Sequence, residues 1–217
     1  MMINETVTNN LISNEELATL GMTREDRLQA ISRIRDDARK IWTLEKMERY
    51  NKETALKNYT NCYAYAIGAT CTVSDLYRPG MISGAKGHKA EFVDEYELMD
   101  CFRKDCQRLN LPFTQIITKE ATQLARFERD YDFNANEHMI GLFSLKYYDG
   151  VIRGFHFIRY DPEIGWSEKK DFGGYASKIE DLKSVISKAE YTLAGAFIIH
   201  RKDYGEDEAK PMGGYLS

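Results

Sequence analysis

The chain has 217 residues, a formal net charge of -4 and a hydrophobic content of 43%. This length suits one domain with a sizeable core, or a domain with a helical arm. The acidic balance predicts no strongly basic face, which argues against nucleic acid as a partner. The longest apolar stretches fall short of the roughly 20 residues that span a bilayer, so no membrane partner is expected.

The chain start and the cysteines bear on location and cofactors. Residues 1–10 lack a basic segment followed by an apolar run, so no secretory signal is predicted and a cytoplasmic location is expected, with delivery by a phage or a secretion route as the other possibility. The thiols are therefore expected to be reduced. Their spacing is not that of a zinc site, so neither a metal nor another cofactor is predicted. The four cysteines are Cys62, Cys71, Cys101 and Cys106.

The first 57 residues are predicted to form a helical N-terminal arm. Thr23 and Asp26 have the spacing of a capping box. Apolar residues then recur at helical spacing as far as Trp42, which predicts a helix from about residue 23 to the middle forties or the fifties. Its charged face is expected to be solvated, and the alternative is an arm that docks a protein partner.

A short helix and a loop follow. In N-Y-T-N-C-Y-A-Y-A-I-G, residues 63–67 are predicted to be helical and to end at Gly68. Residues 77–87 contain S-G-A-K-G and are expected to be an irregular loop. A phosphate-binding loop is disfavoured there because the pattern G-x-x-x-x-G-K-[ST] is missing. Asp94 and Glu97 form a second capping box, which predicts another helix through Leu109.

The remainder is predicted to be mainly strands. They are expected at 111–118, 139–148, 151–160, 166–170 and 193–200, with Asp149-Gly150 as a hairpin turn. Ser177 and Glu180 suggest a cap for one further helix, and residues 202–217 are expected to be a polar tail. Helices followed by an antiparallel sheet predict an α+β fold, with a domain over 58–201 whose sheet packs on the helix near Cys62.

Cys62 is the candidate nucleophile because it lies where that short helix is expected to start. A thiol attacks as the thiolate, and a helix N-terminus favours negative charge. The N–H of Cys62, or that of a neighbour, could serve as an oxyanion donor. The competing interpretation is a small buried thiol, which is the commonest environment of cysteine and which residue type alone favours.

His156 is the candidate base among four histidines. It lies inside G-F-H-F-I-R-Y, a strand that is apolar on both sides of it. It is either a satisfied core residue or the imidazole that faces Cys62. His88 is expected to be exposed in its loop, His138 to be at the surface, and His200 to end the last strand.

A third side chain is expected to orient the imidazole. If Asp161 pairs with Trp166 across the P-E-I-G turn, Asp171 lies opposite His156 on the next strand. A slip of one residue would place Lys170 there instead. Asp171 is therefore the first choice, and the alternatives are Asp161, Ser167 and Glu168.

This order of parts resembles the papain-like superfamily, and most of all its compact NlpC/P60 and CHAP-type amidases and peptidases. The resemblance rests on N-C-Y-A-Y-A at 61–66 and on G-F-H-F-I-R-Y-D with W-S-E-K-K-D, and it covers roughly residues 58–175. It implies hydrolysis of a peptide, amide or isopeptide bond through a thioester. Oxyanion or substrate contacts are considered for Asn61, Tyr63 and Trp166, with capping and packing as the alternative for all three.

A non-catalytic function is the second hypothesis. The protein could be a binding or structural module, for instance a component of a virion or a secretion apparatus, that has a hydrolase-like fold. The acidic balance, the N-terminal helix and the polar tail suit a partner-binding protein as well. The discriminating feature is whether Cys62 reaches a cleft with His156 close by.

Overall fold

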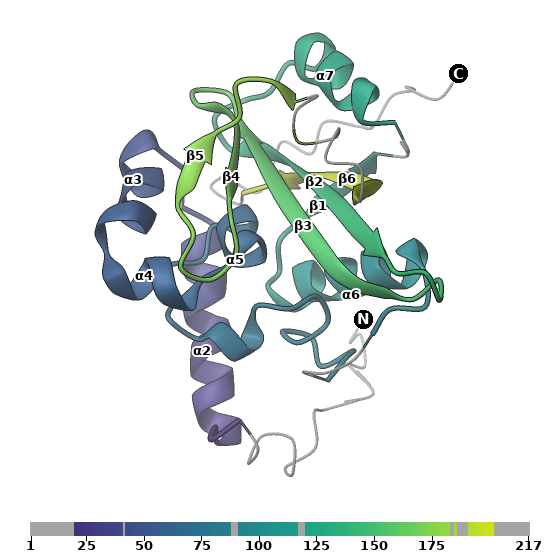
Figure 1. The fold of residues 1–217 in the computed structure, drawn as a ribbon. Helices are drawn as coiled ribbons and strands as arrows, with labels where there is room; N and C mark the ends of the chain where they lie inside the picture. Colours follow the sequence, from purple (N-terminus) through teal and green to yellow (C-terminus); the bar gives the residue numbers. More distant parts are fainter. Residues whose placement is uncertain are drawn as a thin grey trace, which may run out of the picture.

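The computed structural model describes residues 20–40, 42–87, 91–116, 120–182, 185 and 191–201. In these ranges six antiparallel strands form one sheet in the order β1-β6-β2-β3-β4-β5 (Figure 1). The strands are β1 (Phe113–Ile116), β2 (Glu137–Lys146), β3 (Ile152–Asp161), β4 (Gly165–Lys169), β5 (Ala176–Lys178) and β6 (Tyr191–His200). The expected α+β class is confirmed.

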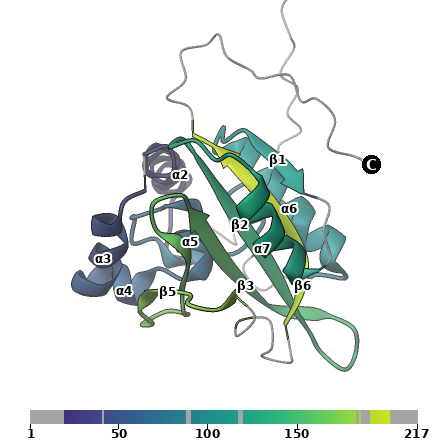
Figure 2. The same cartoon turned by 90° about the horizontal axis from the view of Figure 1, so that it is seen from above.

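Helices cover both faces of this sheet (Figure 2). On one face, α2 (Arg24–Ala38), α5 (Cys62–Ile67) and α6 (Glu95–Arg108) pack in a single core with apolar side chains of β2, β3 and β6. On the other face, Leu124 of α7 (Ala121–Asp130) joins a second cluster with Phe143, Ile158 and Trp166. The period-two alternation of the strands supplies both apolar faces.

Between residues 20 and 59 the structure describes three helices in place of the one long helix expected. The Thr23 capping box is present and begins α2. After α2 ends, the Thr43 hydroxyl accepts from the N–H of Lys46 and starts α3 (Leu44–Lys52), and α4 (Thr54–Tyr59) follows. The apolar face of α2 lies in the same core as α5, so the boundary expected at residue 57 does not separate two cores.

Two other local predictions are confirmed. The Asp94 carboxylate caps α6 by accepting from the N–H of Glu97 at 2.8 Å. Gly150 has φ +83° in the turn between β2 and β3, a conformation that glycine adopts without strain. The hairpin therefore forms at Asp149-Gly150, as the sequence indicates.

The predicted register between β3 and β4 is wrong by one residue. Asp161 pairs with Gly165 and Tyr160 pairs with Trp166. Gly165 has φ +82°, so the turn closes one residue earlier than expected. Continuing the pairing beyond its last pair, Ile158 with Glu168, places Lys170 and not Asp171 opposite His156.

Sequence patterns missed α7 and the short strand β5. Ser177 was expected to cap a helix, but it lies in β5 and pairs with Glu168. Most of that expected helix, His88 and the polar tail lie outside the described residues. None of the helices in the described ranges combines the length and apolar character needed to cross a bilayer.

Candidate active site

Cys62 is the first residue of α5, and the residue before it fixes the start of the helix. The Asn61 side chain accepts from the N–H of Ala64 at 3.0 Å, which is an ordinary N-cap bond. Its amide nitrogen donates to the Tyr77 carbonyl at 2.6 Å. The Asn61 side chain therefore caps the N–H of Ala64 and does not bond to the N–H of Cys62. Its bond to Tyr77 connects the start of the helix to the following loop.

The two side chains considered for the oxyanion have structural contacts. Tyr63 is fully buried and donates its hydroxyl to Asp105 at 2.7 Å. Asn61 lines the cleft around Cys62, but both ends of its amide are engaged by the backbone. Capping and packing therefore account for both residues, and the backbone N–H of Cys62 is the better oxyanion candidate.

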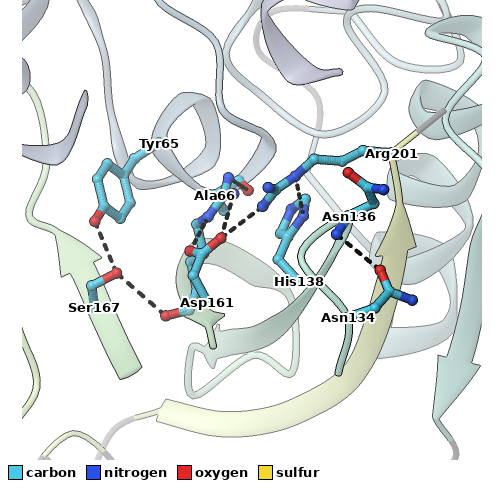
Figure 3. Close-up of polar contacts among 9 residues, drawn as sticks. Tyr65, Ala66, Asn134, Asn136, His138, Asp161, Ser167 and Arg201 are labelled. Carbon is cyan, nitrogen blue, oxygen red and sulfur yellow. Dashed lines mark hydrogen bonds and ion pairs between the residues drawn. The ribbon is translucent and has the colours of Figure 1, made fainter. Parts of the chain in front are cut away.

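The C-terminal end of α5 is anchored to the sheet. Arg159 of β3 donates to the carbonyl of Ala66 at 3.0 Å, which satisfies a helix-end acceptor. Gly68 ends the helix with φ +80°. Tyr65 donates its hydroxyl to Ser167 at 2.8 Å, as Figure 3 shows. Cys62 is consequently carried by a short helix that is fixed at both ends.

Asp161, one alternative for the third residue, is occupied elsewhere. It accepts a bidentate pair from Arg159 at 2.5 and 2.8 Å. Figure 3 shows a further bond to it from Arg201, at 2.6 Å. His138, expected at the surface, is instead fully buried beside this cluster. Burial, and then the charges of Arg159 and Arg201, hold its pKa well below the usual range. His138 is therefore a neutral core residue.

Glu168 is the residue that contacts the candidate base. Nε2 of His156 donates to Oε2 of Glu168 at 2.7 Å. Glu168 pairs with Ile158, so it is the diagonal neighbour of His156 on the same face of the sheet. Asp171, the first choice from sequence, lies in the cleft wall, and its Oδ1 accepts from the N–H of Phe172. Ser167, another alternative, donates to the Arg159 carbonyl.

Cys62 and His156 line the same cleft. Burial would lower the pKa of His156, but hydrogen bonding to the side chains of Cys62 and Glu168 outweighs it and raises that pKa to about 9. Because Glu168 occupies Nε2, Nδ1 is the nitrogen that remains for the thiol. The Cys62 sulfur also lies 4.0 Å from the carbonyl oxygen of Phe155, the residue before His156.

The cleft has a volume of about 750 Å³ and an aromatic lining. Cys62 is only 5% exposed, yet it belongs to the cleft wall together with His156 and Glu168. Trp166, expected to line the cleft, packs in the cluster with α7 and donates to Glu128 at 2.7 Å. The aromatic side chains in the wall are Tyr59, Tyr77, Phe143, Phe155, Phe172 and Tyr191.

The other three thiols have different surroundings. Burial raises the pKa of Cys71 and of Cys101 to about 12 in each case, and the pKa of Cys106 lies well above its usual range for the same reason. All four cysteines are free. Among the described residues no group of three or more histidine, cysteine or carboxylate side chains could hold a metal ion.

A second histidine–glutamate pair lies on another strand. His200 Nδ1 is 3.0 Å from Glu137 Oε1, and its Nε2 is 3.0 Å from the Thr114 hydroxyl. This pair has a hydroxyl where His156 has a thiol. A strand histidine bonded to a glutamate is thus not specific to the cleft, and the thiol is what distinguishes the His156 site.

Comparisons with protein-family models, curated proteins and solved structures find no match to this chain. The case for a papain-like hydrolase therefore rests on the residues and their geometry.

Proposed function

We propose that this protein is a cysteine hydrolase that cleaves a peptide, amide or isopeptide bond. The observation that carries the proposal is a single cleft lined by Cys62, His156 and Glu168, in which Glu168 bonds to His156 at 2.7 Å and Cys62 and Glu168 together raise the pKa of His156. A nucleophile, a base and a group that orients the base are what acyl transfer through a thioester needs. Glu168 takes the third position in place of Asp171.

The reaction follows from these groups. In the resting site the thiol proton already resides on His156, and the Cys62 thiolate attacks the carbonyl carbon while the Cys62 N–H stabilises the oxyanion. The imidazolium then protonates the departing amine as the carbon–nitrogen bond breaks, which leaves a thioester. Water adds to the thioester, gives its proton to His156 and releases the acid and the free thiol. Glu168 fixes the ring orientation and stabilises the imidazolium in both steps.

One observation favours the second candidate, a binding module without catalysis. Cys62 is 5% exposed, which is the burial of a structural thiol. A binding module would use the same aromatic cleft to hold a partner segment without forming a bond to it. The two candidates differ in the reactivity of one sulfur.

Alkylation of the native protein tests the proposal. Iodoacetamide at neutral pH is expected to label Cys62 faster than Cys71, Cys101 or Cys106, because an imidazolium favours a thiolate at Cys62, whereas burial raises the pKa of the other three thiols. Peptide mass spectrometry measures all four rates in one sample. Cys62→Ala is expected to abolish acylation by an activated amide or ester probe. Equal labelling of all four cysteines would reject the hydrolase and favour the binding module.

A further inference from the structure

Lys169 is a buried cation behind the candidate nucleophile. Its side chain is fully buried, although lysine is among the residues least often found inside a protein. Among the described residues, all four of its hydrogen-bond acceptors are backbone carbonyl oxygens. They belong to Lys57 (3.1 Å), Thr60 (2.8 Å), Lys170 (3.3 Å) and Asp171 (3.2 Å).

These acceptors place the ammonium at the entry to α5. The shortest bond is to the carbonyl of Thr60, which belongs to the peptide group between Thr60 and the cap residue Asn61. The bond to Lys57 reaches the last turn of α4, and the Lys57 carbonyl also accepts from the N–H of Gly173. Lys169 therefore fixes the segment that presents Cys62.

Glu168, the residue before Lys169 in β4, contacts the other half of the candidate site. Successive residues of a strand project to opposite faces, so Glu168 and Lys169 point away from each other. Glu168 bonds to His156, whereas Lys169 bonds to the chain that carries Cys62. Two consecutive residues of one strand thus hold the base and the nucleophile.

The electrostatic surroundings link Lys169 with Cys62. Burial lowers the pKa of Lys169 to about 8, and the charges of Cys62 and Asp171 act in the opposite direction. An uncharged donor would satisfy the carbonyls without the cost of burying a charge. The four carbonyl oxygens and the charge of Cys62 both favour the charged ammonium at this position.

We infer that Lys169 is a positioning residue for Cys62, which holds the Thr60 carbonyl and stabilises the Cys62 thiolate by its positive charge. This inference rests on the proposed hydrolase function. Interaction between the two groups is reciprocal, so each stabilises the charged form of the other by the same amount. Removing either Lys169 or Cys62 is therefore expected to change the pH at which the other group titrates.

The first experiment measures Cys62 alkylation between pH 5 and pH 9. In Lys169→Met and Lys169→Gln, the pH of half-maximal rate is expected to rise by about one unit, because an opposite charge has been removed. Lys169→Gln keeps a hydrogen-bond donor and so separates charge from packing. Lys178→Met, at an exposed position of β5, is the matched control and is expected to behave as wild type.

The second experiment leaves Lys169 in place. The Lys169 side-chain carbon resonance is followed against pH in the wild type and in Cys62→Ser, and the titration midpoint is expected to fall in the variant. This measurement decides the question if the Lys169 variants do not fold. An unchanged midpoint, or a wild-type alkylation profile in a folded Lys169→Gln, overturns the inference. If either of these results is found while Cys62 still reacts faster than the other thiols, the Lys169 inference is wrong and the hydrolase proposal stands.

Discussion

Replacing Glu168 by glutamine tests the orienting role directly. The pKa of His156 lies at about 9 against an ordinary value of 6.5, and Glu168 is one of the two side chains that raise it. Loss of the carboxylate charge is expected to lower the pKa of His156 by about one unit. The imidazolium is the acid that protonates the leaving amine, so the alkaline fall in activity, expected near pH 9, moves down by the same amount. Turnover at neutral pH is expected to fall on the order of 100-fold, because the ring loses its orientation.

The same substitution has a defined effect on stability. A histidine whose pKa is raised by folding contributes stability that is complete below its unfolded pKa near 6.5 and is lost as pH rises through about 9. Glu168→Gln is expected to lower the free energy of unfolding at pH 6 by about 1.4 kcal/mol, the equivalent of one pKa unit. Above pH 9 the difference is expected to shrink. Urea denaturation at both pH values measures it.

A matched control comes from the second histidine–glutamate pair. Glu137→Gln removes the carboxylate that bonds to His200 at 3.0 Å, so a similar histidine–carboxylate contact is lost away from the cleft. It is expected to leave the pH–rate profile of acylation unchanged. If Glu168→Gln acylates with the wild-type profile, or if Glu137→Gln shifts the profile equally, the orienting role of Glu168 is refuted.

Two further variants test the surroundings of the site. Trp166→Phe is expected to leave the Cys62 alkylation rate within about twofold of wild type, since the indole packs with α7 outside the cleft. A larger change in the Cys62 alkylation rate, measured by mass spectrometry, would show that Trp166 contributes to the site. Arg159→Met is expected to cost about 3 kcal/mol in urea denaturation by leaving Asp161 one buried partner short. Arg153→Met, at partly exposed ion pairs with Glu91 and Asp149, is expected to cost less than about 1 kcal/mol.

Local signals in the sequence predicted much of the fold. The capping box at Thr23, the N-cap at Asp94 and the Asp149-Gly150 turn act within a few residues and are present, although the Glu97 side chain accepts from the N–H of Val93 and so does not complete the second box. The prediction of one long N-terminal helix was wrong because Thr43 caps a new helix within a continuous helical pattern of apolar residues. Apolar periodicity reports which residues face a core, but not where one helix stops and another starts.

The candidate site was predicted only in part, because its third member depends on a register. The thiol and the imidazole were proposed from residue type and setting, and both line one cleft. The orienting residue required the length of the β3–β4 turn, and the left-handed Gly165 shortens that turn by one residue. A one-residue slip carries every side chain of a strand to the other face, so Asp171 and Glu168 exchange roles with a single change of pairing.

The resulting register explains why β4 matters to both halves of the site. With Glu168 opposite Ile158, its carboxylate lies diagonal to His156 and bonds to the imidazole. The same register directs Lys169 to the opposite face, into the carbonyl oxygens ahead of Cys62. In the register expected from the sequence, Lys169 would take the place of Glu168 opposite Ile158, where its ammonium would repel the imidazolium of His156, and Lys170 would take the place of Lys169. The charge order of Glu168 and Lys169 is therefore compatible with this register and opposed to the shifted one.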